Sequence, residues 1–106
     1  MSGSVVLVWS EELLNYDLGA THPMAPGRLE LTMALADDLD VLALGNIRIS
    51  APRPASSEAL QLVHDPAYIA AVRAAVPGDS VRLHDAFGLG GEDNPIFKGM
   101  HEASAL

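Results

Sequence analysis

Four histidines are among the side chains of this 106-residue sequence that could bind a metal or transfer a proton: His22, His64, His84 and His101. No two of them are four positions apart, the spacing that places two imidazoles on one helix face, and no Asp-x-His or His-x-His segment occurs. The absence of cysteine excludes disulfides, thiolate metal ligands and cysteine nucleophiles. We therefore expect this chain to bind no metal, and we interpret His64 as a structural residue at a helix junction.

The second candidate for chemistry is a glycine-rich segment over 88–91 that is followed by Glu92 and Asp93. A dinucleotide-binding loop needs a third glycine where Asp93 stands and a strand before it, and adjacent carboxylates would repel phosphate, so that function is excluded. Carboxylates on such a loop could instead accept hydrogen bonds from a peptide backbone. The alternative is that Asp93 or Asn94 caps the following helix.

Arg28 stands where a helix is expected to begin, at the end of the helix dipole that disfavours a cation. It should therefore have an anionic partner, which is either a structural carboxylate or a ligand. A serine nucleophile has no support, because no Gly-x-Ser-x-Gly segment is present. These residues alone assign no catalytic group.

The charge balance excludes other classes of function. Six Lys and Arg residues stand against 14 Asp and Glu, giving a formal net charge of −8. Binding to nucleic acid or to an anionic membrane requires a basic surface, so neither partner is expected. No apolar stretch approaches the roughly 20 residues that span a bilayer, and no signal-peptide pattern opens the sequence. We expect a cytoplasmic protein.

The elements that must position these residues form an α/β pattern. Continuous apolar residues over 5–9 predict a strand that is covered on both faces; the alternative is a buried helix segment. Residues 46–50 predict a second strand. Between the two strands, residues 15–27 are expected to form a loop. Residues 28–44 are expected to form a helix that Gly45 would cap. Further helices are expected over 56–63, from Asp65 to Pro77, and from about 98 onward, still running at Leu106; 77–97 are mostly loop.

Two strands cannot cover the helices that this pattern predicts. We therefore expect residues 1–106 to be the opening portion of a larger α/β domain with a parallel sheet, rather than a complete one.

Four motifs in order resemble the histone deacetylase family, and one of them, Arg28–Thr32, is similar to the bacterial acetoin utilization proteins of the AcuC type. The segment His22–Leu29 is similar to the family's first-loop motif, H-P-x-x-P-x-R-[LI]. The segment 55–60, with His64-Asp65 and Tyr68-Ile69 after it, resembles a pair of family helices. The segment 91–97 with Gly99-Met100 resembles the family's second loop.

This resemblance implies the N-terminal portion of a zinc-dependent deacetylase with an arginase–deacetylase type of fold. The family uses zinc and paired histidines to activate the water that attacks an acetamide, and the acetyl-lysine side chain enters through a tunnel of loops. The family's zinc ligands and histidine pair lie downstream of the second loop and are not in this chain. We therefore expect the 106 residues alone to be inactive.

The resemblance also assigns substrate-binding residues. Asp93 matches a rim carboxylate that holds the substrate backbone, and Arg28 matches an arginine at the inner end of the tunnel that faces the acetate product. The residues matching the tunnel-lining first loop are Tyr16, His22, Pro23 and Met24. The expected substrate is an acetylated lysine in a protein or a small acetamide.

Two alternatives remain. The chain could be a stand-alone small acidic interaction protein, derived from a deacetylase by truncation, that buries its apolar face against a partner or a second copy. It could also belong to an acetylpolyamine amidohydrolase, although 91–97 fit the acetoin utilization pattern better. The oligomeric state is left open.

Overall fold

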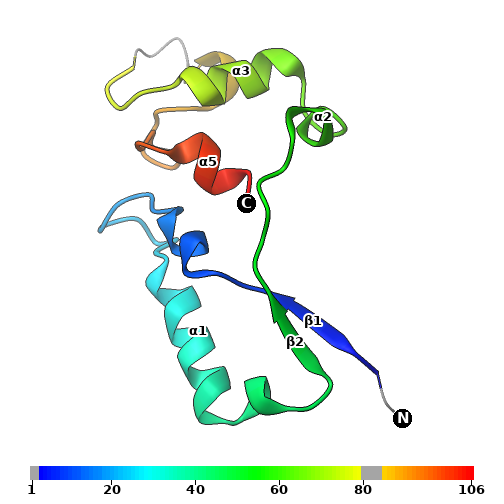
Figure 1. The fold of residues 1–106 in the computed structure, drawn as a ribbon. Coiled ribbons are helices and arrows are strands. Elements are labelled where there is room, and N and C mark those ends of the chain that lie inside the picture. The colour runs from blue at the N-terminus through cyan, green and yellow to red at the C-terminus, as the bar shows by residue number, and fades with distance from the viewer. Residues whose placement is uncertain (1–2, 80–84) are drawn as a thin grey trace.

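The computed structural model describes residues 3–79 and 85–106, which form two groups of elements (Figure 1). In one group a two-stranded sheet lies beside helix α1; the other group contains α2, α3 and α5. In chain order the elements are β1 Val5–Val8, a 3-10 helix Glu11–Asn15, α1 Gly27–Asp38, a 3-10 helix Val41–Ala43, β2 Ile47–Ser50, α2 Ser57–Leu60, α3 Pro66–Ala74 and α5 Met100–Ser104.

The two strands pair in parallel, as predicted. Val5 lies opposite Ile47 and Val8 opposite Ser50, and the pairing continues where the Trp9 amide donates to the Ser50 carbonyl at 2.9 Å. Helix α1 lies in the connection between the strands (Figure 1), which is the usual crossover of a parallel pair. The expected α/β class is therefore confirmed.

Helix α1 is shorter than the predicted 28–44, and Gly45 does not cap it. It ends at Asp38, and Asp40 then adopts a left-handed backbone with φ of 57° before the second 3-10 helix begins. The carboxylates of Asp37 and Asp38 lie at the negative end of the helix dipole, which weakens the last turn. Aspartate is also among the few residues that tolerate the left-handed conformation.

The helix predicted over 56–63 begins as expected but ends at Leu60. The Ser56 hydroxyl accepts a hydrogen bond from the Ala59 amide at 3.1 Å and so caps its start. After Leu60 the backbone forms short-range bonds typical of 3-10 turns, such as the Val63 amide to the Leu60 carbonyl at 3.2 Å. The chain is thereby turned into the next helix.

Helix α3 starts where the sequence predicts. The Asp65 carboxylate accepts a hydrogen bond from the Ala67 amide at 2.7 Å, and Pro66 occupies the first helical position. The helix ends at Ala74, before the predicted stop at Pro77, because Ala75 already has an extended backbone.

The interpretation of Asp93 or Asn94 as a helix cap is wrong, because α5 begins only at Met100. Gly99 precedes it with φ of 82°, a conformation that glycine adopts without a steric penalty. The helix was predicted to continue at Leu106 but ends at Ser104. Within 77–97, predicted to be mostly loop, residues 85–87 are helical.

The core of the described residues lies between α3 and α5. Its buried apolar side chains are Ile69, Leu89, Met100 and Ala105. The sheet is open by comparison, since Val5, Val6 and Val8 are each at least half exposed. The predicted coverage of the strands on both faces is therefore not present within this stretch.

The accessible surface is 7745 Å², whereas a compact chain of this mass exposes about 5,700 Å². The radius of gyration is 16.9 Å, against about 13 Å for a compact domain of this length. The excess is consistent with apolar faces that no other element covers. Across residues 3–79 and 85–106, no helix combines the length and the apolar character needed to cross a membrane.

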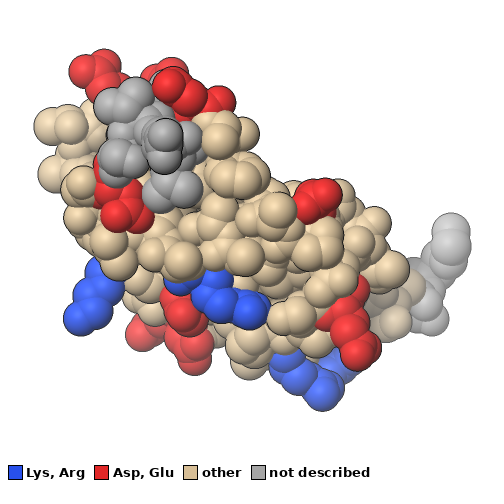
Figure 2. Space-filling model, turned by 90° about the horizontal axis from the view of Figure 1, so that it is seen from above, with Lys and Arg blue, Asp and Glu red and all other residues tan. Residues whose placement is uncertain are grey.

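Figure 2 shows acidic and basic side chains interspersed on the face seen from above, with the basic ones in small separate groups.

Candidate functional site

Two loops that are far apart in sequence meet at one cavity. We name residues 16–26 the first loop and residues 88–97 the second loop. The Nε2 atom of His22, in the first loop, lies 2.9 Å from the backbone oxygen of Asp93, which is 71 positions later. A cavity of about 480 Å³ opens beside this contact; its lining residues are Leu18, Thr21, His22, Pro23, Glu92, Asp93 and Pro95.

The first loop is shaped by local hydrogen bonds. The Asp17 carboxylate accepts from the Gly19 amide at 3.0 Å, and the His22 amide donates to the Gly19 carbonyl at 3.1 Å. Gly19 has φ of 109°, which explains a glycine at this turn. The Met24 amide then donates to Nδ1 of His22 at 3.0 Å. The loop thus turns around the imidazole of His22.

Asn94 closes the second loop through three hydrogen bonds. Its side-chain amide donates to the Gly88 carbonyl at 2.9 Å. Its carbonyl accepts from the Gly90 amide at 2.9 Å, and its own amide donates to the Gly91 carbonyl at 3.2 Å. Gly88 and Gly90 have positive φ, as expected for glycines that allow a sharp turn.

The closed loop is anchored to the core and presents Asp93 outward. Leu89, inside the loop, is only 2% exposed. Asp93 is exposed, and within the part of the chain that the structure describes its carboxylate has no hydrogen-bonding partner. An exposed carboxylate on a fixed loop beside a cavity is able to accept hydrogen bonds from a ligand.

An aromatic pair provides a further contact between the loops. The rings of Tyr16 and Phe97 lie with centroids 5.4 Å apart and planes at 90°, the edge-to-face arrangement that the ring quadrupoles favour. Sequence reasoning selected Tyr16 but missed Phe97, and it considered Asn94 only as a helix cap. Phe97 lies at the end of the second-loop motif, which was the available signal for it.

The other predicted site residues lie at different distances from the cavity. Pro23 lines it beside His22. Met24 does not, and its side chain is 52% exposed. Arg28 is exposed in the first turn of α1 and also lies outside the lining. Among the described residues no carboxylate pairs with its guanidinium, so the structural-carboxylate alternative gains no support.

The described residues do not fit a zinc site, since no three of their His, Cys, Asp or Glu side chains are grouped to hold a metal. Both ring nitrogens of His22 already have backbone partners. His64 packs against Tyr68, consistent with its expected structural role. Nε2 of His101 lies 3.4 Å from an Arg73 nitrogen, and His84 lies outside the described residues.

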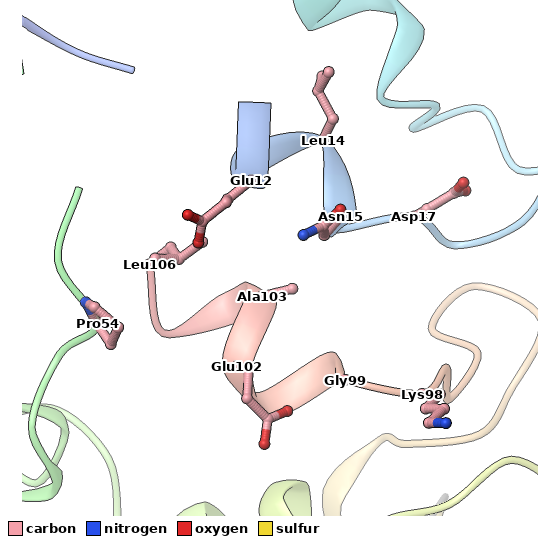
Figure 3. A pocket seen from close by; sticks show the side chains of 10 residues that line it. All are labelled: Glu12, Leu14, Asn15, Asp17, Pro54, Lys98, Gly99, Glu102, Ala103 and Leu106. Carbon is pink, nitrogen blue, oxygen red and sulfur yellow. The ribbon is translucent and has the colours of Figure 1, made fainter. Parts of the chain in front are cut away.

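A second cavity, of about 510 Å³, lies between the first 3-10 helix and α5 (Figure 3). Its polar lining includes Glu12 and Asp17 from one side and Lys98 and Glu102 from the other. None of these residues was predicted as a site residue, and carboxylates alone do not define one.

Comparison with known proteins gives a consistent set of relatives. The histone deacetylase domain family matches residues 22–106. The acetoin utilization protein AcuC of Bacillus subtilis (strain 168) is 38% identical over 102 residues, 95% of this chain and 26% of that protein. AcuC of Staphylococcus xylosus is 38% identical over 99 residues, which are 92% of this chain and 25% of that protein. Histone deacetylase 2 of Oryza sativa subsp. japonica is 34% identical over 100 residues, which are 92% of this chain and 19% of that protein. The chain thus spans about a quarter or less of the length of these relatives.

Proposed function

The chain belongs to the histone deacetylase family, and we propose that it supplies the substrate-contacting loops of an enzyme that hydrolyses acetyl-lysine amides. The proposed substrate is an acetylated lysine in a protein or a small acetamide. A role in acetoin utilization is part of the proposal and is supported by the two AcuC relatives. The proposed location is the cytoplasm.

The observation that carries this proposal is the carboxylate of Asp93, which has no partner among residues 3–79 and 85–106, at the rim of the cavity between the two loops. A carboxylate in this position can accept two backbone N–H groups from one peptide. Hydrogen bonds to a charged group contribute roughly 1.5–3 kcal/mol each. Asp93 would therefore hold a peptide at its backbone while the acetylated side chain is directed into the protein.

Arg28 has a separate proposed role. The Arg28 guanidinium at the start of α1 has no carboxylate partner in the part of the chain that the structure describes and is available there to an anion, and acetate is the anion that deacetylation releases. The first-loop residues Tyr16, His22, Pro23 and Met24 would form one wall of the substrate path. His22 and Pro23 support this role by lining the cavity.

No catalytic step is assigned to this chain, because its described residues do not fit a zinc site. We place the metal-binding and proton-transferring groups in the remaining part of the family domain. The loops described above would then act on substrate binding and orientation.

The assay that tests this function measures acetate released by the complete protein from an acetyl-lysine peptide and from an acetylpolyamine. An acetylpolyamine has no peptide backbone for Asp93 to bind, so we expect kcat/KM to be at least about tenfold higher for the peptide. Preference for the acetylpolyamine would favour the amidohydrolase alternative. Release of acetate from neither substrate would contradict a deacetylase.

A small interaction protein is the second candidate, and the exposed apolar faces are the observation that favours it. Val6 and Val8 of β1 and Leu31 and Leu35 of α1 are all at least half exposed. A partner or second copy could cover these faces instead of the rest of a family domain.

A further inference from the structure

We propose that His22 is a positioning residue that holds Asp93 in its substrate-binding position, and that it does so only as the neutral imidazole. This inference rests on the proposed function and adds a specific residue and a pH dependence to it. His22 would act through the backbone of the second loop and not by touching the reacting atoms.

The hydrogen bonds determine which tautomer His22 adopts. The backbone oxygen of Asp93 can only accept, so Nε2 of His22 must carry the proton and donate it at 2.9 Å. The Met24 amide can only donate, so Nδ1 must be unprotonated and accept at 3.0 Å. Neutral imidazole protonated at Nε2 satisfies both partners at once, and no other protonation state does.

The two bonds couple the loops. The bond to Met24 orients the imidazole within the first loop, and the bond to Asp93 attaches the second loop to it. The attachment is on the backbone of the residue whose carboxylate is proposed to bind the substrate. Asn94, the residue after Asp93, closes the second loop by its bonds to Gly88, Gly90 and Gly91. The position of the Asp93 carboxylate relative to the first loop therefore depends on His22.

Protonation of Nδ1 would remove this arrangement. The ring would then present an N–H group to the Met24 N–H, and two donors cannot bond to one another. The charged groups that share the cavity with His22 are Glu92 and Asp93 of the second loop. On its own loop the nearby carboxylate is Asp17, which accepts from the Gly19 amide. We expect the imidazole to reorient when charged and the Asp93 loop to lose its attachment.

Two substitutions in the complete protein separate the two bonds. In His22→Gln the side-chain amide reaches as far as Nε2 and can still donate to the Asp93 carbonyl. In His22→Asn the shorter side chain can accept from the Met24 amide in an Asx turn but cannot reach Asp93. His64→Asn is the matched control, because it removes an imidazole that packs on Tyr68 and, among the described residues, has no hydrogen bond to either loop.

The readout is KM for an acetyl-lysine peptide compared with KM for a small acetamide without a peptide backbone. We expect His22→Asn to raise KM for the peptide about fivefold to tenfold with kcat nearly unchanged. His22→Gln should recover most of this loss, and His64→Asn should change KM less than about twofold. Equal KM values for the wild type and His22→Asn would overturn the inference.

The pH dependence of substrate selectivity gives a second test, because a merely structural role of His22 would not produce it. In the wild type, selectivity for the peptide over the small acetamide should fall when the pH is lowered far enough to protonate Nδ1 of His22. In His22→Gln the same ratio should stay flat. A parallel fall in both proteins would overturn the inference.

A measurement without turnover separates this inference from the proposed function. Nitrogen NMR shifts of the His22 ring, assigned by their absence in His22→Gln, report the tautomer directly. We expect the form protonated at Nε2, and the form protonated at Nδ1 would overturn the inference even in an active deacetylase. Loss of the proposed function would appear separately, as a wild type that releases no acetate.

Discussion

Replacing Asp93 by alanine in the complete protein should lower kcat/KM for an acetyl-lysine peptide about 100-fold, mostly through KM. The carboxylate is exposed, unpaired among the described residues and held by a closed loop. The loss of two charge-assisted hydrogen bonds, partly replaced by water, corresponds to about 3 kcal/mol. A small acetamide has no peptide backbone for Asp93 to bind and should lose less than about threefold.

Two further variants define the cause of this effect. Glu92→Ala is the matched control, because Glu92 lines the same cavity one position earlier and has no proposed role with the substrate backbone. Asp93→Asn keeps an acceptor oxygen but loses the charge, so an intermediate loss of about tenfold is expected. Bound zinc should be unchanged in all three variants. An equal loss for the peptide and the small acetamide would remove Asp93 from the substrate role.

The 106 residues expressed alone should unfold without a sharp cooperative transition and should bind a hydrophobic dye. Their surface of 7745 Å² exceeds that of a compact chain of the same mass by roughly 2,000 Å². The buried apolar residues among those described are confined to the region of α3, α5 and Leu89, while the sheet has an open apolar face. An isolated two-stranded sheet is marginally stable in water. Thermal unfolding followed by circular dichroism measures the transition.

The outcome distinguishes the two candidate functions. A monomer with a sharp cooperative melt would contradict the prediction that the 106 residues are unstable alone, because it would show that the apolar faces need no further element to cover them. A defined oligomer that melts cooperatively would support the small interaction protein instead. Sedimentation of the same sample determines the oligomeric state.

The sequence predicted those features that depend on local chemistry. The apolar run over 5–9 predicted a strand, and the Asp65-Pro66 pair predicted the start of α3. The helix ends were predicted less well, because they depend on competition between weak effects. The left-handed turn at Asp40 is allowed for aspartate, but nothing in the local pattern favours it over continuation to Gly45.

Of the residues predicted for the site, His22, Pro23 and Asp93 line the cavity, but the contacts between them were not predicted. Family resemblance selected Asp93 and His22 separately. Their hydrogen bond joins residues 71 positions apart and depends on how the chain folds between them. The pairing of Tyr16 with Phe97 has the same origin. Asn94 was missed because its three bonds appear only once the loop has closed.

A crystal structure of the complete protein with an acetyl-lysine peptide bound would test the role of Asp93 without relying on turnover. We expect backbone N–H groups of the peptide to donate to the Asp93 carboxylate, with the acetylated side chain entering beside His22 and Pro23. A peptide bound elsewhere, with the Asp93 carboxylate facing solvent, would contradict this role.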